Sequence, residues 1–310
     1  MLDGVRTLPN FRAYCELVCE LTKTNILREL QGGNLSLLRQ NSFTSLLTVM
    51  VSSLSLLHVR ERYGVEPRCV AGYSVGQWTA LHAAGVLDFP ALARVVLARA
   101  GFMDACVSSE PSGMYAVIGL EQAAIERVLG ELRAAGQRVY ISNVNCLGNY
   151  SIAGTLEALD LAKRRLAALN PKLLSPVPVS GAWHCPILQD AERAFADYLL
   201  TVRLAPASIP VADNVTGRWL PDDSQQRVRH LARHLSSPVE WHASIKHCVA
   251  IGGSRFLELG YGSSLTKLGF FIERRAVFEA FDSSRGRSRI LQSDGSELPQ
   301  SVGGPDPCAA

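Results

Sequence analysis

The sequence lacks a strong charge of either sign, because 31 lysine and arginine residues stand against 28 aspartate and glutamate residues. The resulting net charge of +3 is too small for a chain whose main partner is a nucleic acid. Charged residues make up 19% and hydrophobic residues 47% of the chain, as in an ordinary globular protein with a sizeable core. The 310 residues exceed the usual size of one compact domain, so we expect a large domain that carries a smaller insertion.

Signals for membranes, export and bound metals are also missing. The N-terminus has no basic stretch followed by an apolar one, and the apolar run over residues 45–59 is shorter than the roughly 20 residues of a membrane span. We therefore expect this run to form a buried core helix, and we expect no membrane partner. The eight cysteines form no CxxC pair, and Cys15 and Cys19 are better interpreted as two buried thiols of one helix than as metal ligands. The chain is predicted to be reduced and cytoplasmic, with no metal and no cofactor.

The first third of the sequence is mainly helical in pattern. Apolar residues recur at three- and four-residue spacing over residues 8–60, which predicts helices with a polar break near 31–34. Residues 68–72 (RCVAG) are typical of a short buried strand that ends in a sharp turn. The helix after this turn is expected to end at Gly85, a common C-terminal cap, and Asp88 is expected to begin the next helix.

The middle of the chain alternates strands and helices in the order β-α-β-β-α-β, which is the ferredoxin-like pattern. The expected strands and helices cover, in order, residues 114–120, 121–135, 139–145, 150–154, 155–169 and 173–179. We interpret residues 113–179 as a small subdomain inserted into a larger domain. Beyond residue 283 the composition is rich in serine, glycine and proline, which predicts a disordered tail over 283–310.

A serine on a sharp turn is the first candidate for chemistry. Residues 72–76 (GYSVG) form a G-x-S-x-G motif between a predicted strand and a predicted helix, so both glycines are expected to relieve crowding around an exposed Ser74. The following helix directs its first N–H groups at a developing oxyanion, and the N–H of Val75 is one expected donor. From the motif alone, the alternative is a chance glycine turn that contains a serine.

A serine hydroxyl needs a base to become a nucleophile, and the sequence has seven histidines. His184 is favoured by its position, because it follows a predicted strand and begins a helix at the end of the insertion. Arg99 falls on the apolar face of its helix, three residues after Val96, whereas Arg94 points elsewhere. A guanidinium on a buried face needs an anionic partner, which either an internal salt bridge or a ligand supplies.

These three residues, in this order, resemble the malonyl-CoA:acyl carrier protein transacylase family, which includes the acyltransferase domains of polyketide and fatty acid synthases. The resemblance runs from about residue 1 to 282. Residues 72–76 resemble the family's G-H-S-x-G elbow, and residues 99–103 (RAGFM) resemble its R-x-x-x-M helix. Further similar segments are 143–154 (NVNCLGNYSIAG), 177–186 (VPVSGAWHCP), 209–214 (IPVADN), 238–241 (PVEW) and 257–265 (LELGYGSSL).

The resemblance implies an α/β fold and a ping-pong reaction. An α/β-hydrolase-like large domain, residues 1–112 and 180–282, is expected to carry a ferredoxin-like small subdomain over residues 113–179. His184 would take the proton from Ser74, and Ser74 would attack malonyl-CoA to form a malonyl-serine ester. The phosphopantetheine thiol of an acyl carrier protein would then collect the acyl group.

The same resemblance implies roles for residues that bind the acyl group. Arg99 is expected to pair with the distal carboxylate of the malonyl group, and Asn145 of the small subdomain's hairpin is expected to bind substrate. Val75 after the nucleophile and the bulky Trp183 before the histidine favour malonyl over methylmalonyl. The basic triplet at 163–165 (KRR) is a candidate contact for an acidic carrier protein, although a solvated basic face is the favoured interpretation.

The chain departs from the family pattern in several places. The family's first strand and its G-Q-G-S-Q loop, which supplies a second oxyanion donor, are not found, so we expect the start of this chain to be internal. Tyr73 and Gln77 stand in place of the usual histidine and glutamate. His234 stands where the family usually has glutamine, near a turn whose backbone carbonyl orients the catalytic histidine.

These departures leave three functions open. One is malonyl transfer to a carrier protein in fatty acid or polyketide synthesis. The second is the malonyltransferase subunit of malonate decarboxylase, which the GYSVG elbow also resembles. The third is a truncated homologue with thioesterase-like activity or none, although a buried Arg99 argues against a plain hydrolase, which needs no carboxylate clamp.

Overall fold

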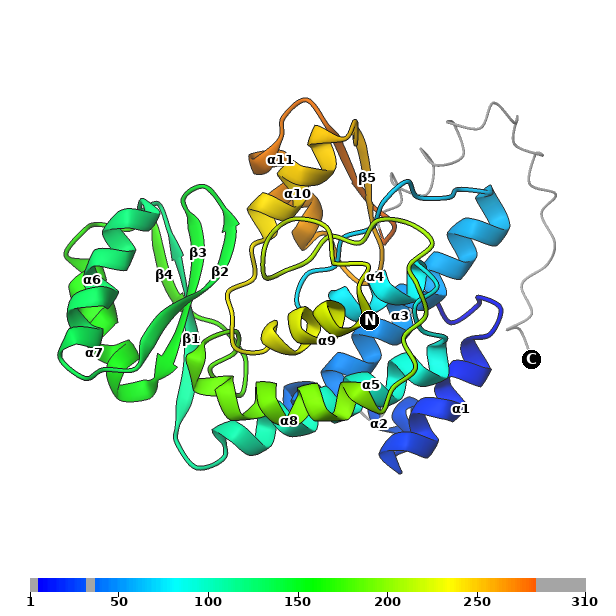
Figure 1. Cartoon of the computed structure of the whole chain (residues 1–310), viewed down its shortest axis with the longest axis horizontal. Helices are drawn as coiled ribbons and strands as arrows, with labels where there is room; N and C mark the ends of the chain where they lie inside the picture. Colours follow the sequence, from blue (N-terminus) through cyan, green and yellow to red (C-terminus); the bar gives the residue numbers. More distant parts are fainter. Residues whose placement is uncertain (1–4, 32–36, 283–310) are drawn as a thin grey trace, which may run out of the picture.

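The computed structural model describes residues 5–31 and 37–282 of the chain. Figure 1 shows a larger region made mainly of helices and a smaller region, on the left, built on a β-sheet. The larger region begins with α1 (Phe11–Thr22), α2 (Ile26–Gln31), the 3₁₀ helix η1 (Leu37–Arg39), α3 (Asn41–Tyr63), α4 (Gly76–Ala83) and α5 (Phe89–Val107).

The predicted helical stretch over residues 8–60 is divided into separate helices. α1 ends because Lys23 takes a left-handed conformation with φ 53°, a break that the apolar spacing did not predict. The predicted polar break near 31–34 begins where α2 ends, and residues 32–36 lie outside the described residues. The predicted caps are confirmed: Gly85 has φ 74°, and the Asp88 carboxylate accepts a hydrogen bond from the Ala91 N–H at the start of α5.

The long apolar helix α3 passes through the core of the larger region. Its 23 residues are long and apolar enough to cross a membrane, so length alone does not decide its role. However, 72% of its most apolar window is buried inside the protein, where it packs against α4 and α5. Burial therefore supports the prediction of a core helix. This helix is longer than the predicted apolar run over residues 45–59.

The predicted strand over residues 68–72 is reduced to a single parallel bridge between Val70 and Val211. The Val70 N–H donates to the Pro210 carbonyl at 3.0 Å, and the Ala212 N–H donates to the Val70 carbonyl at 2.8 Å. Pro210 has no N–H to extend the ladder, and the chain turns sharply after Gly72. The prediction of a strand was too long, but the extended segment does lead into the serine turn.

The smaller region has the predicted β-α-β-β-α-β order. Its elements are β1 (Ser112–Ile118), α6 (Gln122–Ala134), β2 (Val139–Cys146), β3 (Asn149–Thr155), α7 (Leu156–Ala167) and β4 (Leu173–Pro176). The four strands form an antiparallel sheet in the order β2-β3-β1-β4, the ferredoxin-like topology. Leucine, isoleucine and valine side chains from the sheet and from α6 and α7 form a separate core beneath these helices. The proposed boundaries at 113 and 179 stay predictions.

The strand predicted over residues 173–179 ends at Pro176. Pro178 has no N–H for the ladder, and the Val179 N–H turns back onto the Val177 carbonyl at 2.8 Å. The chain then crosses to the larger region as an irregular segment, and His184 lies in a bend of this segment. We predicted from the sequence that His184 directly follows a strand and begins a helix, and this prediction was wrong about the strand.

The rest of the chain completes the larger region. Its elements are η2 (Pro186–Leu188), α8 (Gln189–Leu200), α9 (Ser224–Arg233), α10 (Trp241–Ala250), β5 (Arg255–Glu258), α11 (Ser264–Ile272) and β6 (Val277–Ala280). β5 and β6 pair in parallel, with α11 between them in the sequence. A second parallel bridge, between Asn143 of β2 and Val239, joins the two regions near the serine turn. The predicted tail over residues 283–310 lies outside the described residues.

Candidate active site

The serine turn holds Ser74 in a strained backbone conformation. Ser74 has φ 49°, in the left-handed region that non-glycine residues rarely occupy. A Cβ atom on Gly72 would overlap the Gly76 carbonyl, so no larger residue fits at that position. At Gly76 a Cβ atom would meet no neighbouring atom, and our prediction that both glycines relieve crowding is therefore wrong for the second one.

The structure brings Ser74 and His184 together, although 110 residues separate them in the sequence. Ser74 Oγ lies 2.6 Å from His184 Nε2, and His184 Nδ1 lies 2.9 Å from the backbone carbonyl of His234. A carbonyl only accepts hydrogen bonds, so Nδ1 carries the proton and Nε2 presents its lone pair to the serine hydroxyl. This arrangement is that of a nucleophile with its general base.

Burial keeps the His184 ring neutral. The side chain is 3% exposed, and its pKa is lowered to about 3. Desolvation by burial is the largest cause, and the positive charge of Arg99 acts in the same direction. The bond to the His234 carbonyl opposes both effects. His184 itself has φ 58°, so a second strained residue faces the first across the site. A neutral imidazole at ordinary pH is the form that can accept the Ser74 proton.

From Ser74 to Trp78, the backbone leaves one N–H without a protein acceptor. The N–H groups of Gly76, Gln77 and Trp78 are bonded to the carbonyls of residues 73–75. The Ser74 N–H donates to the side chain of Asn214 at 2.9 Å. Across residues 5–31 and 37–282, the Val75 N–H donates to no protein acceptor. This is the donor predicted from the sequence, and it stays a prediction.

Asn214 was missed in the sequence analysis. Its Oδ1 accepts the Ser74 N–H, and its Nδ2 donates to the Gly72 carbonyl at 2.6 Å and to Gln77 Oε1 at 2.5 Å. One amide thus fixes the first residue of the elbow, the nucleophile and the first turn of α4. Segment 209–214 matched the family pattern, which was the available signal, but nothing in the sequence pointed to the amide itself.

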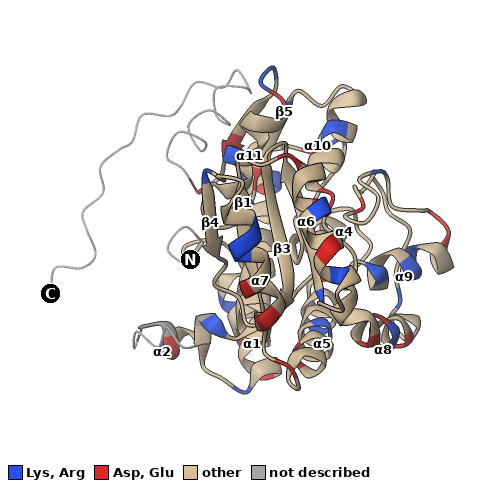
Figure 2. Cartoon of the chain, turned by 90° about the vertical axis from the view of Figure 1, so that its left-hand side faces the viewer, with Lys and Arg blue, Asp and Glu red and all other residues tan. Residues whose placement is uncertain are grey.

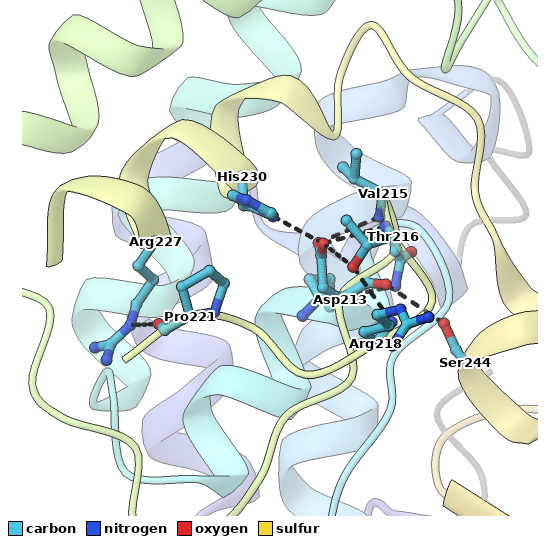
Figure 3. Close-up of polar contacts among 10 residues, drawn as sticks. Asp213, Val215, Thr216, Arg218, Pro221, Arg227, His230 and Ser244 are labelled. Atoms are coloured by element: carbon cyan, nitrogen blue, oxygen red, sulfur yellow. Dashed lines mark hydrogen bonds and ion pairs between the residues drawn. The ribbon is translucent and has the colours of Figure 1, made fainter. Parts of the chain in front are cut away.

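Figure 3 shows the polar network that supports the Asn214 segment. Asp213 is buried, and its carboxylate accepts from the N–H groups of Val215 and Thr216, from the Thr216 hydroxyl at 2.8 Å and from His230 Nδ1 at 2.9 Å. Nearby, the buried Arg227 donates to three backbone carbonyls of residues 205, 221 and 222. The bonds to the Asp213 carboxylate fix the residue before Asn214, so His230 has a structural role here.

Replacing Asn214 with alanine is expected to lower the free energy of unfolding by about 2–4 kcal/mol, because it leaves the Ser74 N–H, the Gly72 carbonyl and Gln77 Oε1 without their partner. Urea denaturation measures this change. The control Asn25→Ala removes one exposed bond from the Arg28 N–H at the start of α2 and should cost about 1 kcal/mol. Equal losses in the two variants would contradict the bracing role of Asn214.

Arg99 lies on the buried face of α5, as predicted, while Arg94 is exposed. The Arg99 side chain is 2% exposed, and its Nε and Nη2 have no hydrogen-bond partner within the described residues. Burial lowers its pKa to about 10, opposed by the negative charge of Asp104. Arg99 therefore stays charged near neutral pH. No ion pair to Arg99 occurs in the described part of the chain, so its guanidinium has donors free for an anionic ligand.

Val75 and Trp183 line one small cavity of about 100 Å³. Its other walls come from η1 and the first turns of α3, and from the segment that leads to His184. Asn145 is elsewhere: its Oδ1 accepts the Tyr73 hydroxyl at 2.7 Å and its Nδ2 donates to Asn149 Oδ1 at 3.0 Å. The structure thus brings Val75 and Trp183 together, while Asn145 links β2 to the elbow. The substrate-binding roles of these residues stay predictions.

The basic triplet of α7 is largely paired with acidic residues. Arg164 bonds to Asp160 at 2.7 Å, Arg165 bonds to Glu131 of α6 at 3.1 Å, and Lys163 lies over the Tyr115 ring. Figure 2 shows blue and red segments together on α6 and α7. This favours the solvated face over a carrier contact. Among residues 5–31 and 37–282, no group of three or more histidine, cysteine, aspartate or glutamate side chains could hold a metal ion.

Comparison with known proteins identifies similar enzymes. The model of the acyl transferase domain family matches residues 17–269. The malonyl CoA-acyl carrier protein transacylase of Bacillus subtilis is 30% identical over 227 residues, which are 73% of this chain and 71% of that protein. The transacylase of the same name from Salmonella typhimurium is 34% identical over 221 residues, 71% of each chain.

Solved structures resemble the whole described fold. A malonyl-CoA:acyl carrier protein transacylase from Xanthomonas oryzae has a TM-score of 0.87 at 27% identity, covering 92% of this chain and 90% of that one. The complex of a type II PKS acyl-carrier protein with its malonyl-transacylase has a TM-score of 0.87 at 28% identity, covering 94% of both chains. These similarities confirm the predicted α/β fold class.

Proposed function

We propose that the chain moves a malonyl group from malonyl-CoA to an acyl carrier protein through an ester on Ser74. This proposal starts from the fact that the chain belongs to the acyl transferase domain family. The chain is an acyltransferase, as its relatives are. The observation that carries the serine ester is the 2.6 Å contact of Ser74 Oγ with His184 Nε2, beside the buried cation Arg99.

In the first half of the reaction, His184 Nε2 takes the proton from Ser74 Oγ as the oxygen attacks the thioester carbon of malonyl-CoA. The Val75 N–H stabilises the tetrahedral oxyanion. The carbon–sulfur bond then breaks, and the CoA thiolate leaves with the proton from His184. In the second half, the phosphopantetheine thiol of the carrier protein gives its proton to His184 and attacks the ester carbon. The bond from that carbon to Ser74 Oγ then breaks, and His184 returns the proton to Ser74 Oγ.

Arg99 supplies the selectivity for a diacid. Its Nε–H and Nη2–H, which have no partner in the described residues, can both bond to the distal malonyl carboxylate, and this pairing gives the buried charge a direct ionic partner. Val75, which follows the nucleophile in the sequence, and Trp183 line the same small cavity, and their bulk favours malonyl over methylmalonyl. We also propose a cytoplasmic location and a turnover that needs no cofactor beyond the acyl donor.

Mass spectrometry of the intact protein after incubation with malonyl-CoA tests this proposal. We expect a malonyl adduct on Ser74 that is stable for minutes in buffer and disappears when a carrier protein with its phosphopantetheine arm is added. Rapid release of free malonate without a carrier would indicate a thioesterase. The absence of any adduct would indicate an inactive homologue and would overturn the proposed function.

A further inference from the structure

The imidazole ring of His234 lies against the proposed base, and the reaction described above does not use it. His234 caps the C-terminus of α9, and its side chain is 1% exposed. Its ring stacks on the His184 ring with 4.9 Å between the ring centroids and 20° between the planes. Within the described residues, neither ring nitrogen of His234 has a hydrogen-bond partner.

The backbone of His234 does not explain this ring. The carbonyl that accepts the His184 Nδ1–H belongs to the main chain, so any residue at this position could supply it. The glutamine of the family pattern would supply the same carbonyl without an aromatic face. A buried imidazole with two unpaired nitrogens is also unfavourable compared with an apolar side chain. The role of the backbone carbonyl therefore does not explain why residue 234 carries an imidazole.

Burial, together with the charges around His234, keeps the ring neutral. Burial is the largest cause that lowers its pKa, followed by the effects of His184, from the segment before η2, and of Arg99, from α5. The nearby acidic residue of α8, Glu192, accepts a hydrogen bond from the Ser236 hydroxyl and not from His234. A neutral ring excludes water from the face of His184 that it covers, and it adds no positive charge beside the base.

We propose that the His234 ring is a positioning residue for His184: it fixes the plane of the base and seals that face from water, so that Nε2 stays an unprotonated acceptor for the Ser74 hydroxyl. This inference rests on the proposed function only in naming His184 as the base. In the wild type the proton passes from Ser74 Oγ to His184 Nε2, while Nδ1–H remains bonded to the His234 carbonyl.

The sealing effect gives a direction for the pH dependence. In the wild type, the pKa of His184 lies at about 3, so the base stays neutral throughout pH 5.5–7.5. If water reaches the uncovered ring, its pKa rises toward the ordinary value of about 6.5. A base with that pKa is mostly protonated at pH 5.5, and kcat/KM then falls roughly tenfold between pH 7.5 and 5.5.

Three variants separate the ring from the rest of the residue. His234→Phe keeps an aromatic face without nitrogens and should retain the flat profile of the wild type. His234→Ala and His234→Gln remove the face, keep the carbonyl, and should each acquire the tenfold acid loss. Two such variants are made so that a folding failure in one leaves the other, and circular dichroism at each pH checks that they are folded.

The closing experiment measures two rates for each variant across this pH range. One is kcat/KM for malonyl transfer, and the other is the rate at which a fluorophosphonate probe modifies Ser74, which needs the neutral base but no malonyl group. Identical pH profiles in all variants, or an acid loss in His234→Phe as large as in His234→Ala, would overturn the inference. Probe labelling that follows the expected pattern without any malonyl transfer would instead count against the proposed function alone.

Discussion

Replacing Ser74 with alanine is expected to abolish the malonyl adduct and to lower malonyl transfer by roughly 10⁶-fold, as when the nucleophile of a serine triad is removed. Ser74 Oγ is the atom aligned with the lone pair of His184 Nε2, so no other hydroxyl receives the same activation. The measurement is the rate of transfer to the carrier protein together with the mass of the protein after exposure to malonyl-CoA.

Stability should change little in this variant, because the Ser74 N–H keeps its bond to Asn214. Alanine adopts the left-handed conformation at residue 74 with a strain similar to that of serine. Ser254→Ala is a matched control that should leave transfer unchanged, because Ser254 is an exposed serine outside the proposed site. Transfer within tenfold of the wild type in Ser74→Ala, or an adduct that persists on it, would refute the assignment of the nucleophile.

The smaller region could be predicted from the sequence nearly element by element. Its sheet and its core are built from one continuous stretch, β1 to β4, so local alternation and helical spacing carry most of the information. The errors are at the ends, as at Pro176, where a proline pair ended the last strand early. In the larger region, the core joins helices from both ends of the chain, and spacing alone does not specify which segments meet.

The candidate site shows the same division. The elbow was visible because five adjacent residues define it. The pairing of Ser74 with His184 rested on the position of His184 after a predicted strand and on the family resemblance, since no local pattern connects residues that far apart. Asn214 was missed because its role depends on a single parallel bridge that brings residues 70 and 211 together. The stacked ring of His234 is likewise a product of tertiary packing, and the sequence indicated only that its backbone was near the base.

Arg99→Met is expected to reduce kcat/KM for malonyl loading by about 10²–10³-fold, because a buried charged pair that loses one partner typically costs 2–5 kcal/mol. Loading of an acetyl group, which has no distal carboxylate, should change by less than about tenfold. The comparison of the two acyl-CoA donors on one variant is the measurement, since a general disturbance of the site would affect both alike. Equal losses for malonyl and acetyl groups would contradict the carboxylate clamp.

The same variant separates binding from folding. Methionine fills a similar volume without a buried charge, and two of the guanidinium nitrogens of Arg99 have no partner in the described residues, so the free energy of unfolding should stay constant or rise. Arg94→Met is the control, because Arg94 lies on the exposed face of the same helix and should alter neither property. A protein that gains stability while it loses malonyl loading would show that Arg99 is kept for its ligand; one that loses both in proportion would show that the guanidinium serves the fold.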